Sequence, residues 1–186
     1  MTELELLNRI KADPEEFSVI FSRYYKPIFG YIFRRTGNFE DTADIAASTF
    51  LKAFRHITKF TYRGISIRIW LYRIATNEVN QFFRFRKKYN TIFELHDFEY
   101  PEIFQHRLYA QDRKELEAEL QRHEQFNIVL KALKTLPVKY QEVISLRYFE
   151  EKDNKEIAAI LDLREGTVKS LLSRGIEKLR KKCNPY

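Results

Sequence analysis

The sequence has few of the residues that form disulfides, tight turns and metal sites. One cysteine, Cys183, among 186 residues excludes an internal disulfide and a multi-cysteine zinc site. The four histidines lack the spacing typical of metal ligands, so we expect no metal site and no cofactor. Five glycines and five prolines are too few for a turn-rich β architecture, and they favour helices instead.

Long apolar runs and catalytic patterns are also missing. No stretch is apolar and long enough to span a bilayer, and the N-terminus lacks a signal-peptide pattern. We therefore expect a cytoplasmic protein that does not insert into membranes. No nucleophile–base pair and no metal-binding carboxylate cluster is recognisable in the sequence. The sequence thus predicts a binding protein rather than an enzyme.

Positive charge is in excess and unevenly distributed. The formal net charge is +7 and the pI is about 9.4, which points to a polyanionic partner such as nucleic acid. Residues 55–90 contain nine basic residues and one acidic residue, whereas residues 91–126 contain four basic and nine acidic ones. Residues 127–186 are basic again, with 13 basic and eight acidic residues. This pattern predicts two polyanion-binding modules separated by an acidic connector.

Residues 153–182 form the most informative stretch, because they predict two short helices joined by a tight turn. Asp153 and Glu156 have the spacing of a capping box at the start of the first helix. The second helix is expected to begin near residues 164–166, and its apolar face includes Gly175. A separate face of this helix is polar and cationic and comprises Thr167, Lys169, Ser170, Ser173 and Arg174.

This polar face has the chemistry needed to read duplex DNA. An α-helix fits the major groove, Arg and Lys pair with guanine edges, and Ser and Thr bond bases or phosphates. The alternative is an ordinary helical hairpin whose polar face is only solvated. The turn spacing, the small Ala158 and the basic C-terminal tail favour a helix-turn-helix DNA-binding unit.

The N-terminal part of the chain predicts three helices. Asp13 and Pro14, followed by Glu16, form a strong helix start with a capping box. Pro27 interrupts the apolar pattern that follows, so a kink or a break is expected there. A turn at residues 36–38 precedes the second helix. A loop around Gly64 precedes the third helix, which begins near residue 67 and continues into the basic stretch 84–88.

Residues 55–90 also hold many aromatic side chains, and two interpretations stay open. Trp70 is most simply a core residue, and the other aromatics could be core residues too. Alternatively, they form a platform for single-stranded nucleic acid, on which stacking is worth about 1–3 kcal/mol per base. The aromatic residues in question are Phe60, Tyr62, Trp70, Tyr72, Phe82, Phe83, Phe85 and Tyr89.

The remaining stretches predict a connector and one more helix. Residues 91–125 are acidic and aromatic without a clean period, and we interpret them as a linker with partial helix. A linker of this charge between two basic modules suggests the hypothesis that it holds the free protein closed. Pro137 begins a helix that runs to about Phe149 and leads into the helix-turn-helix.

Two sets of motifs carry a family resemblance. The first is DTADIAASTFLKAFRHI followed by WLYRIATN, and the second is LPVKYQEVISLRYF followed by KEIAAIL and EGTVKSLLSRGIEKLR. Together they resemble bacterial RNA polymerase sigma factors of the extracytoplasmic-function (ECF) type, which have only regions 2 and 4. The resemblance covers nearly the whole chain except the linker. Response-regulator effector domains share the EIA…TVK pattern, so the N-terminal motifs are needed for this assignment.

The resemblance implies a fold and a function. The fold is all-α, with two small helical domains joined by a linker and a helix-turn-helix in the C-terminal domain. Residues 8–90 match region 2, residues 91–125 are the linker, and residues 126–183 match region 4. The implied function is to bind core RNA polymerase and to direct promoter recognition, melting of the −10 element and transcription initiation. An anti-sigma factor is a candidate further partner.

The resemblance also assigns roles to residues. Contacts with core polymerase are expected from Asp44, Ala47, Ser48, Phe50, Leu51 and Phe54. Contacts with the −10 element are expected from Tyr62, Arg63, Arg73, Asn77, Asn80 and Arg84. Contacts with the −35 element are expected from Lys155, Arg164, Thr167, Lys169, Ser170, Ser173 and Arg174.

Two departures from the family pattern bear on these roles. Many members have Gln-Glu where this chain has Ala47-Ser48, which removes polar contacts expected with core polymerase. Many have Asp at the position of Asn80, so we expect that this chain differs in its sequence preference at the −10 element.

Two other functions are compatible with the sequence. One is a helix-turn-helix transcriptional regulator that acts without polymerase, and the other is an RNA-binding or structural protein whose helix-turn-helix only packs.

Overall fold

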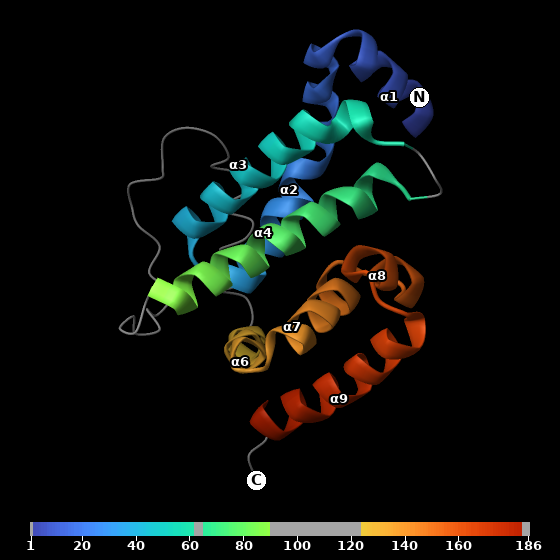
Figure 1. Cartoon of the computed structure of the whole chain (residues 1–186). Coiled ribbons are helices and arrows are strands. Elements are labelled where there is room, and N and C mark those ends of the chain that lie inside the picture. Colours follow the sequence, from blue (N-terminus) through green and yellow to red (C-terminus); the bar gives the residue numbers. More distant parts are fainter. Residues whose placement is uncertain (1, 62–64, 90–123, 184–186) are drawn as a thin grey trace.

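The computed structural model describes residues 2–61, 65–89 and 124–183, and all regular structure in these ranges is helical (Figure 1). The all-α prediction is therefore confirmed for this part of the chain. The N-terminal helices are α1 (Glu3–Ala12), η1 (Pro14–Glu16), α2 (Phe17–Thr36), α3 (Phe39–His56), η2 (Ile57–Lys59) and α4 (Ile67–Tyr89). The C-terminal helices are α6 (Glu124–Lys134), α7 (Val138–Ile144), the π-helical turn η4 (Ser145–Phe149), α8 (Asn154–Leu161) and α9 (Glu165–Cys183). Residues 90–123, which hold most of the predicted linker, lie outside the described ranges.

Helix α1 was not predicted, although its start has a clear local signal. The Thr2 hydroxyl accepts a hydrogen bond from the Glu5 amide at 3.2 Å, and the Glu5 carboxylate accepts one from the Thr2 amide at 2.8 Å. This capping box satisfies two amides that a helix start would otherwise leave unpaired. The apolar side of α1 is buried and consists of Leu6, Leu7 and Ile10.

Helix α2 differs from the prediction in the capping at its start and in its continuity. Asp13 caps η1 by accepting from the Glu15 amide at 3.0 Å, as its position before Pro14 predicts. The predicted capping box is wrong, because the Glu16 carboxylate pairs with Arg9 of α1 instead. Of the kink or break predicted at Pro27, the break is absent, since α2 continues through that residue to Thr36.

The turn between α2 and α3 is formed as predicted. Gly37 adopts φ = 69°, a left-handed conformation that strains residues with a side chain, and its amide bonds the Phe33 carbonyl at 2.7 Å. Asn38 then caps α3 by accepting from the Asp41 amide at 2.9 Å. Helices α2 and α3 are therefore held as neighbours by a turn of minimal length.

The helix-turn-helix is also formed as predicted. Asp153 accepts from the Glu156 amide at 2.7 Å, and the Glu156 carboxylate accepts from the Asp153 amide at 3.0 Å. Helix α8 ends at Leu161, and the capping residue Asp162 adopts φ = 57° and donates its amide N–H to the Ala158 carbonyl. The next helix, α9, begins at Glu165.

Gly175 sets how closely α9 approaches α7. A Cβ atom at this position would lie 3.0 Å from Ile144 Cδ1 and 3.2 Å from Tyr140 Cδ1. Both distances are shorter than ordinary van der Waals contacts, so a larger residue would require the Ile144 and Tyr140 side chains to shift. The prediction that Gly175 belongs to the packed face of α9 is confirmed.

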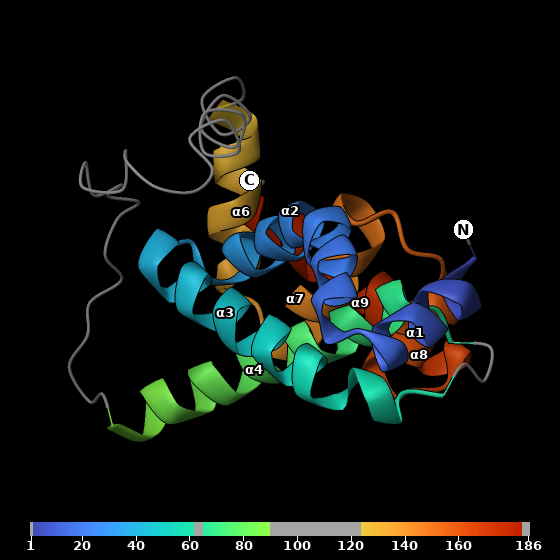
Figure 2. The same ribbon diagram turned by 90° about the horizontal axis from the view of Figure 1, so that it is seen from above.

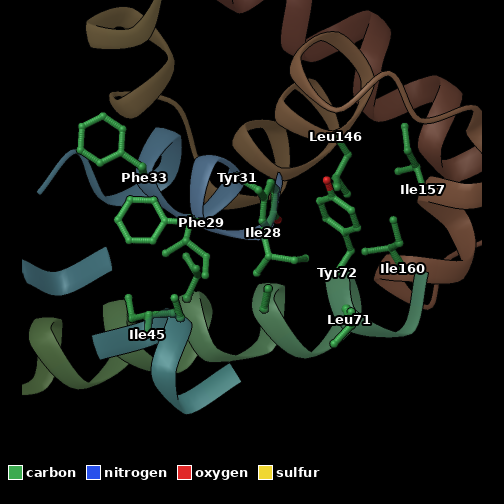
Figure 3. Packing of buried hydrophobic residues seen from close by; sticks show 14 of the residues in the cluster. Ile28, Phe29, Tyr31, Phe33, Ile45, Leu71, Tyr72, Leu146, Ile157 and Ile160 are labelled. Carbon is green, nitrogen blue, oxygen red and sulfur yellow. The ribbon is translucent and has the colours of Figure 1, made fainter. Parts of the chain in front are cut away.

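The two groups of helices pack directly against each other. Figure 1 shows α4 between α3 and the C-terminal helices α7 and α8, and Figure 2 shows the same helices from above. It packs on α8, while α2 packs on η4. One apolar cluster runs through both groups, and Figure 3 shows Tyr72 reaching from α4 toward Leu146, with Ile160 nearby. The ring of Tyr72 also meets that of Tyr31 edge-on, with centroids 5.4 Å apart.

Candidate nucleic-acid and polymerase interfaces

The seven residues predicted to contact the −35 element are all exposed. They lie on α8, in the turn after it and along one side of α9, whose opposite side buries Val168, Gly175 and Leu179. No atom outside the local chain lies within 4 Å of the place where a Cβ of Gly166 would be, so the start of α9 is open. The Ser170 hydroxyl donates to the Gly166 carbonyl at 3.0 Å and keeps its acceptor lone pairs for a partner. The geometry therefore presents a polar, cationic helix face to a large partner.

The residues predicted to contact the −10 element divide into three sets. Asn77 and Arg84 are exposed on α4. Arg73 and Asn80, on the same face, contact the C-terminal helices. Arg73 Nη2 lies 3.1 Å from Asp162 Oδ1, and Asn80 Nδ2 donates to Glu142 Oε1 at 2.6 Å. The remaining two, Tyr62 and Arg63, lie outside the described residues.

The aromatic residues of the 55–90 block are mostly packed. Tyr72 is fully buried, which rules its ring out as an open stacking platform in this arrangement. Phe60 and Trp70 are partly buried and stack on each other, with ring centroids 4.8 Å apart. Phe82 and Phe83 also pack against the core, whereas Phe85 is 64% exposed. Tyr62 and the side chain of Tyr89 lie outside the described part of the chain.

The predicted polymerase contacts form a partly apolar stripe on α3. Asp44 and Ala47 are exposed, Leu51 is 50% exposed and Phe54 is 43% exposed. Large apolar side chains exposed at helical spacing are typical of a docking surface.

Three of the predicted polymerase contacts are engaged within the chain, and one of them is the partly exposed Phe54, whose ring meets that of Phe17 edge-on with centroids 5.3 Å apart. Phe50 is only 4% exposed, and its ring packs against that of Phe21 with centroids 5.0 Å apart. In this conformation Phe50 supports the stripe from the core and does not reach a partner, contrary to its predicted role. The Ser48 hydroxyl donates to Glu78 at 2.8 Å, and Lys52 contacts the same carboxylate at 2.6 Å.

A buried polar cluster that the sequence did not predict joins the two groups of helices. We call it the Glu150 cluster, and it comprises Arg34, Tyr72, Glu150 and Lys152. Glu150 is 6% exposed, and its carboxylate accepts hydrogen bonds from the Arg34 guanidinium and the Tyr72 hydroxyl. Lys152 Nζ donates to the Glu150 carbonyl at 3.1 Å and lies 4.9 Å from the centroid of the Tyr72 ring.

Burial changes the protonation behaviour of this junction. It raises the pKa of Tyr72, and the neighbouring Glu150 carboxylate raises it further, so the phenol stays neutral and donates. Burial lowers the pKa of Lys152, with an added contribution from Arg68. Burial also lowers the pKa of Lys134 to about 8. The Lys134 ammonium contacts the Thr36 carbonyl at 3.4 Å, which places it where α6 meets the end of α2.

Neither a metal centre nor a membrane span is found among the described residues. No group of three His, Cys, Asp or Glu side chains in these ranges could hold a metal ion. None of the described helices is both long and apolar enough to cross a membrane.

Family models match both groups of helices. Residues 20–89 match the model described as Sigma-70 region 2, and residues 126–179 match Sigma-70, region 4. The first match ends with α4. The second begins within α6 and ends within α9.

Curated relatives and solved structures agree with these matches. The chain is 34% identical to the ECF RNA polymerase sigma factor SigW of Bacillus subtilis over 178 residues, covering 92% of this chain and 90% of SigW. It is 30% identical over 189 residues to the ECF RNA polymerase sigma-E factor of Haemophilus influenzae, covering 100% of this chain and 97% of the relative.

Two solved structures share the fold at low sequence identity. One is CnrH in complex with the cytosolic domain of CnrY, with a TM-score of 0.65, 22% identity, and coverage of 95% of this chain and 94% of CnrH. The other is the sigma factor RpoE in complex with the anti-sigma factor NepR from Bartonella quintana, with a TM-score of 0.67, 20% identity, and coverage of 90% and 96%. With both regions matched and a relative aligned over nearly its full length, the chain belongs to the family of ECF RNA polymerase sigma factors.

Proposed function

We propose that this protein binds a bacterial core RNA polymerase and directs it to promoters, with the α8–α9 unit at the −35 element and α4 at the −10 element. The exposed cationic face of the α8–α9 unit is the observation that carries this proposal. Its seven polar residues face solvent together while the opposite side of α9 is fixed against α7. Polymerisation belongs to the partner enzyme, so the role of this chain is regulatory.

At the −35 element, the packing of α9 determines which side chains meet DNA. Val168 and Leu179 are buried, so α9 cannot rotate about its axis without losing its core contacts. Arg174 and Lys169 then point away from the protein and can reach guanine edges, while Thr167 and Ser170 can bond bases or phosphates. A good bidentate contact of this kind is worth about 1–3 kcal/mol of discrimination against a wrong base.

At the −10 element, the task is to hold a separated strand. Flipping a base out of a duplex costs a few kcal/mol, which capture by polar and stacking groups must offset. Asn77 and Arg84 are exposed on α4 and are available for this role. Arg73, Asn80, Tyr62 and Arg63 complete the proposed set.

The polymerase itself is proposed to dock on the α3 stripe. Asp44, Ala47, Leu51 and Phe54 are exposed there, and the buried Phe50 holds the helix in place. Ser48 donates to Glu78, so its hydroxyl is held beside α4 at the edge of the stripe. Because its partner acts in the cytoplasm, this protein is proposed to act there too. An anti-sigma factor is a proposed further partner, since both structural neighbours were solved as complexes with a second protein and NepR is named as one.

The first test is whether the purified protein forms a stable complex with bacterial core RNA polymerase in gel filtration at moderate salt. We expect co-elution, and Leu51→Ala with Phe54→Ala should weaken it. A matched control is Leu4→Ala, which also removes an exposed apolar side chain but lies on α1. Sequence-specific duplex binding by the protein alone, without a polymerase complex, would favour a transcriptional regulator instead.

A further inference from the structure

Neither the predicted helices nor the region 2 family match includes α1. The match begins at residue 20, and α1 ends at Ala12. The apolar side of α1 is nevertheless almost completely buried, with Leu6, Leu7 and Ile10 each exposed by 2% or less. Because a close-packed helix of this kind is a fixed part of the fold, its polar groups are held in defined positions.

One of these polar groups caps another helix. Glu3 Oε2 accepts a hydrogen bond at 3.3 Å from the amide of Ile67, the first residue of α4, and Ile67 is fully buried. The first amides of a helix have no acceptor inside that helix, and a carboxylate is favoured near them. Ser66 supplies a local cap by accepting from the Ile69 amide at 3.2 Å. Glu3 adds a second cap from 64 positions away in the sequence.

Helix α1 also contacts the element that precedes α4. It packs on η2, where Ile57 is only 2% exposed. Directly after η2, the ring of Phe60 stacks on that of Trp70 in α4, with centroids 4.8 Å apart. The two elements that flank residues 60–66 are therefore both in contact with α1, and they are also joined to each other.

Proposed −10 contacts lie on both sides of this capped helix start. Tyr62 and Arg63 precede α4 in the sequence and lie outside the described residues, so their roles stay predictions. Asn77 is exposed on α4, about 15 Å along the helix axis from Ile67. A short segment reaches no farther than its ends allow, and a helix moves as a unit. A displaced start of α4 would therefore misplace both sets of contacts.

We propose that Glu3 is a positioning residue for the −10 contacts, which fixes the start of α4 to α1 and so sets the orientation in which α4 meets the promoter strand. Glu3 touches no DNA and acts through the Ile67 amide. Binding groups must be held within about 0.5 Å of their productive positions, so loss of this cap should reduce discrimination between bases. The effect on DNA rests on the proposed function, whereas the cap itself does not.

The cap is tested by amide hydrogen exchange in the free protein, followed by NMR. In Glu3→Ala the Ile67 amide should exchange about fivefold faster than in wild type, which is the effect expected from losing one hydrogen bond. Glu3→Gln keeps a side-chain oxygen that can accept, so its exchange should stay near the wild-type rate. Glu15→Ala is the matched control, because it makes the same substitution at an exposed site on η1.

The effect on DNA is tested with complexes of each variant and bacterial core RNA polymerase, on a promoter library randomised at the −10 and −35 elements. In Glu3→Ala, enrichment of the preferred bases at the −10 element should fall by up to about fivefold, since one hydrogen bond is lost. Enrichment at the −35 element should be unchanged, because α9 packs mainly on α6, α7 and α8. Glu3→Gln should restore most of the −10 enrichment, and Glu15→Ala should match wild type.

The contrary results separate the cap, the positioning role and the proposed function. Unchanged exchange of the Ile67 amide in Glu3→Ala would refute the cap. Faster exchange with full −10 enrichment would refute the positioning role. Equal losses at the −10 and −35 elements would show that Glu3 only stabilises the fold, which also overturns that role. If the wild-type protein forms no polymerase complex, the proposed function and the positioning role both fail, and the exchange rates still decide whether Glu3 caps α4.

Discussion

The α8–α9 unit and α4 both carry cationic polar faces, yet they differ in what covers them. Helix α9 packs on one side only, so its polar face is open along its length. Helix α4 packs on both sides, against α2 and α3 and against α8, so part of its polar face is already engaged. Residue type alone therefore does not determine whether a helix face is accessible to a partner. The polar face of α9 is therefore accessible to a partner as it stands, whereas that of α4 is accessible only in part.

The largest expected effect on stability comes from removing Glu150, the main polar contact between the two groups of helices. Glu150→Ala leaves Arg34 and Tyr72 without their acceptor, and breaking a buried charge pair costs about 3–5 kcal/mol. We expect the free energy of unfolding, measured in urea, to fall by about 3 kcal/mol. Glu15→Ala should change it by less than about 0.5 kcal/mol. Equal losses in the two variants would show that burial of Glu150 adds nothing.

A change on α9 should affect only the open face. Arg174→Ala should reduce discrimination at the −35 element by about 1–3 kcal/mol, measured as relative affinity of the polymerase complex for matched and mismatched promoters. Core binding should be unaffected, because α9 packs mainly on α6, α7 and α8 and not on α3, which carries the stripe. Lys139→Ala on α7 removes one exposed cation elsewhere and should leave discrimination intact. Equal loss of core binding in Arg174→Ala would contradict the assignment.

The junction between the two regions should also make stability depend on pH. In the folded state the pKa of Lys134 is lowered from 10.5 to about 8, so above pH 8 the unfolded chain binds more protons and stability rises with pH. Lys152 acts in the same direction. Above about pH 10 the trend should reverse, because the buried Tyr31 and Tyr72 have raised pKa values and ionise only on unfolding.

Urea denaturation between pH 7.5 and 10.5 would check this prediction. We expect a maximum between pH 9 and 10 and a rise of about 1 kcal/mol before it, below the limit of about 1.4 kcal/mol per pH unit for one lysine. Lys134→Met should flatten the rise. A maximum that stays unchanged in Lys134→Met would mean that another group is responsible.

The smallest effect on stability is expected at Asp162, which pairs with Arg73 at the edge of the contact between the two groups of helices. Asp162→Asn removes an exposed pair with Arg73, and such pairs are worth about 0–1 kcal/mol. The free energy of unfolding should therefore fall by less than about 1 kcal/mol, and the difference should vanish at high salt. A loss that persists at high salt would indicate that Asp162 also maintains the end of α8.

Local features of the fold were predictable because their partners lie close in the sequence. The Asp153–Glu156 capping box and the turn at Gly37 and Asn38 involve residues within four positions of each other. The polar face of α9 follows from helical spacing alone. Each of these can be read from a short window of residues, which explains why they appear in the structure as predicted.

Features that depend on distant contacts were not predictable in this way. Glu150 bonds Tyr72 and Arg34, which are 78 and 116 residues away, and no periodicity links these positions. Phe50 shares a helix face with the buried Ala46 and Ala53, so helical spacing already favours its burial over that of Leu51, against the role that the family resemblance implies for it. Glu16 was predicted to form a capping box with Asp13. It pairs instead with Arg9, which lies on the unpredicted helix α1.

Gly175 has a consequence for aim as well as packing. It lies near the middle of α9, where this helix packs against α7, so any tilt of α9 turns about this contact. Thr167 is eight residues away, about 12 Å along the helix axis. A tilt of about 5° about the contact at Gly175 therefore moves Thr167 by about 1 Å. A shift of this size is enough to misplace a bidentate contact with a base. The position of the proposed −35 contacts at the start of α9 thus depends on a glycine whose own role is packing.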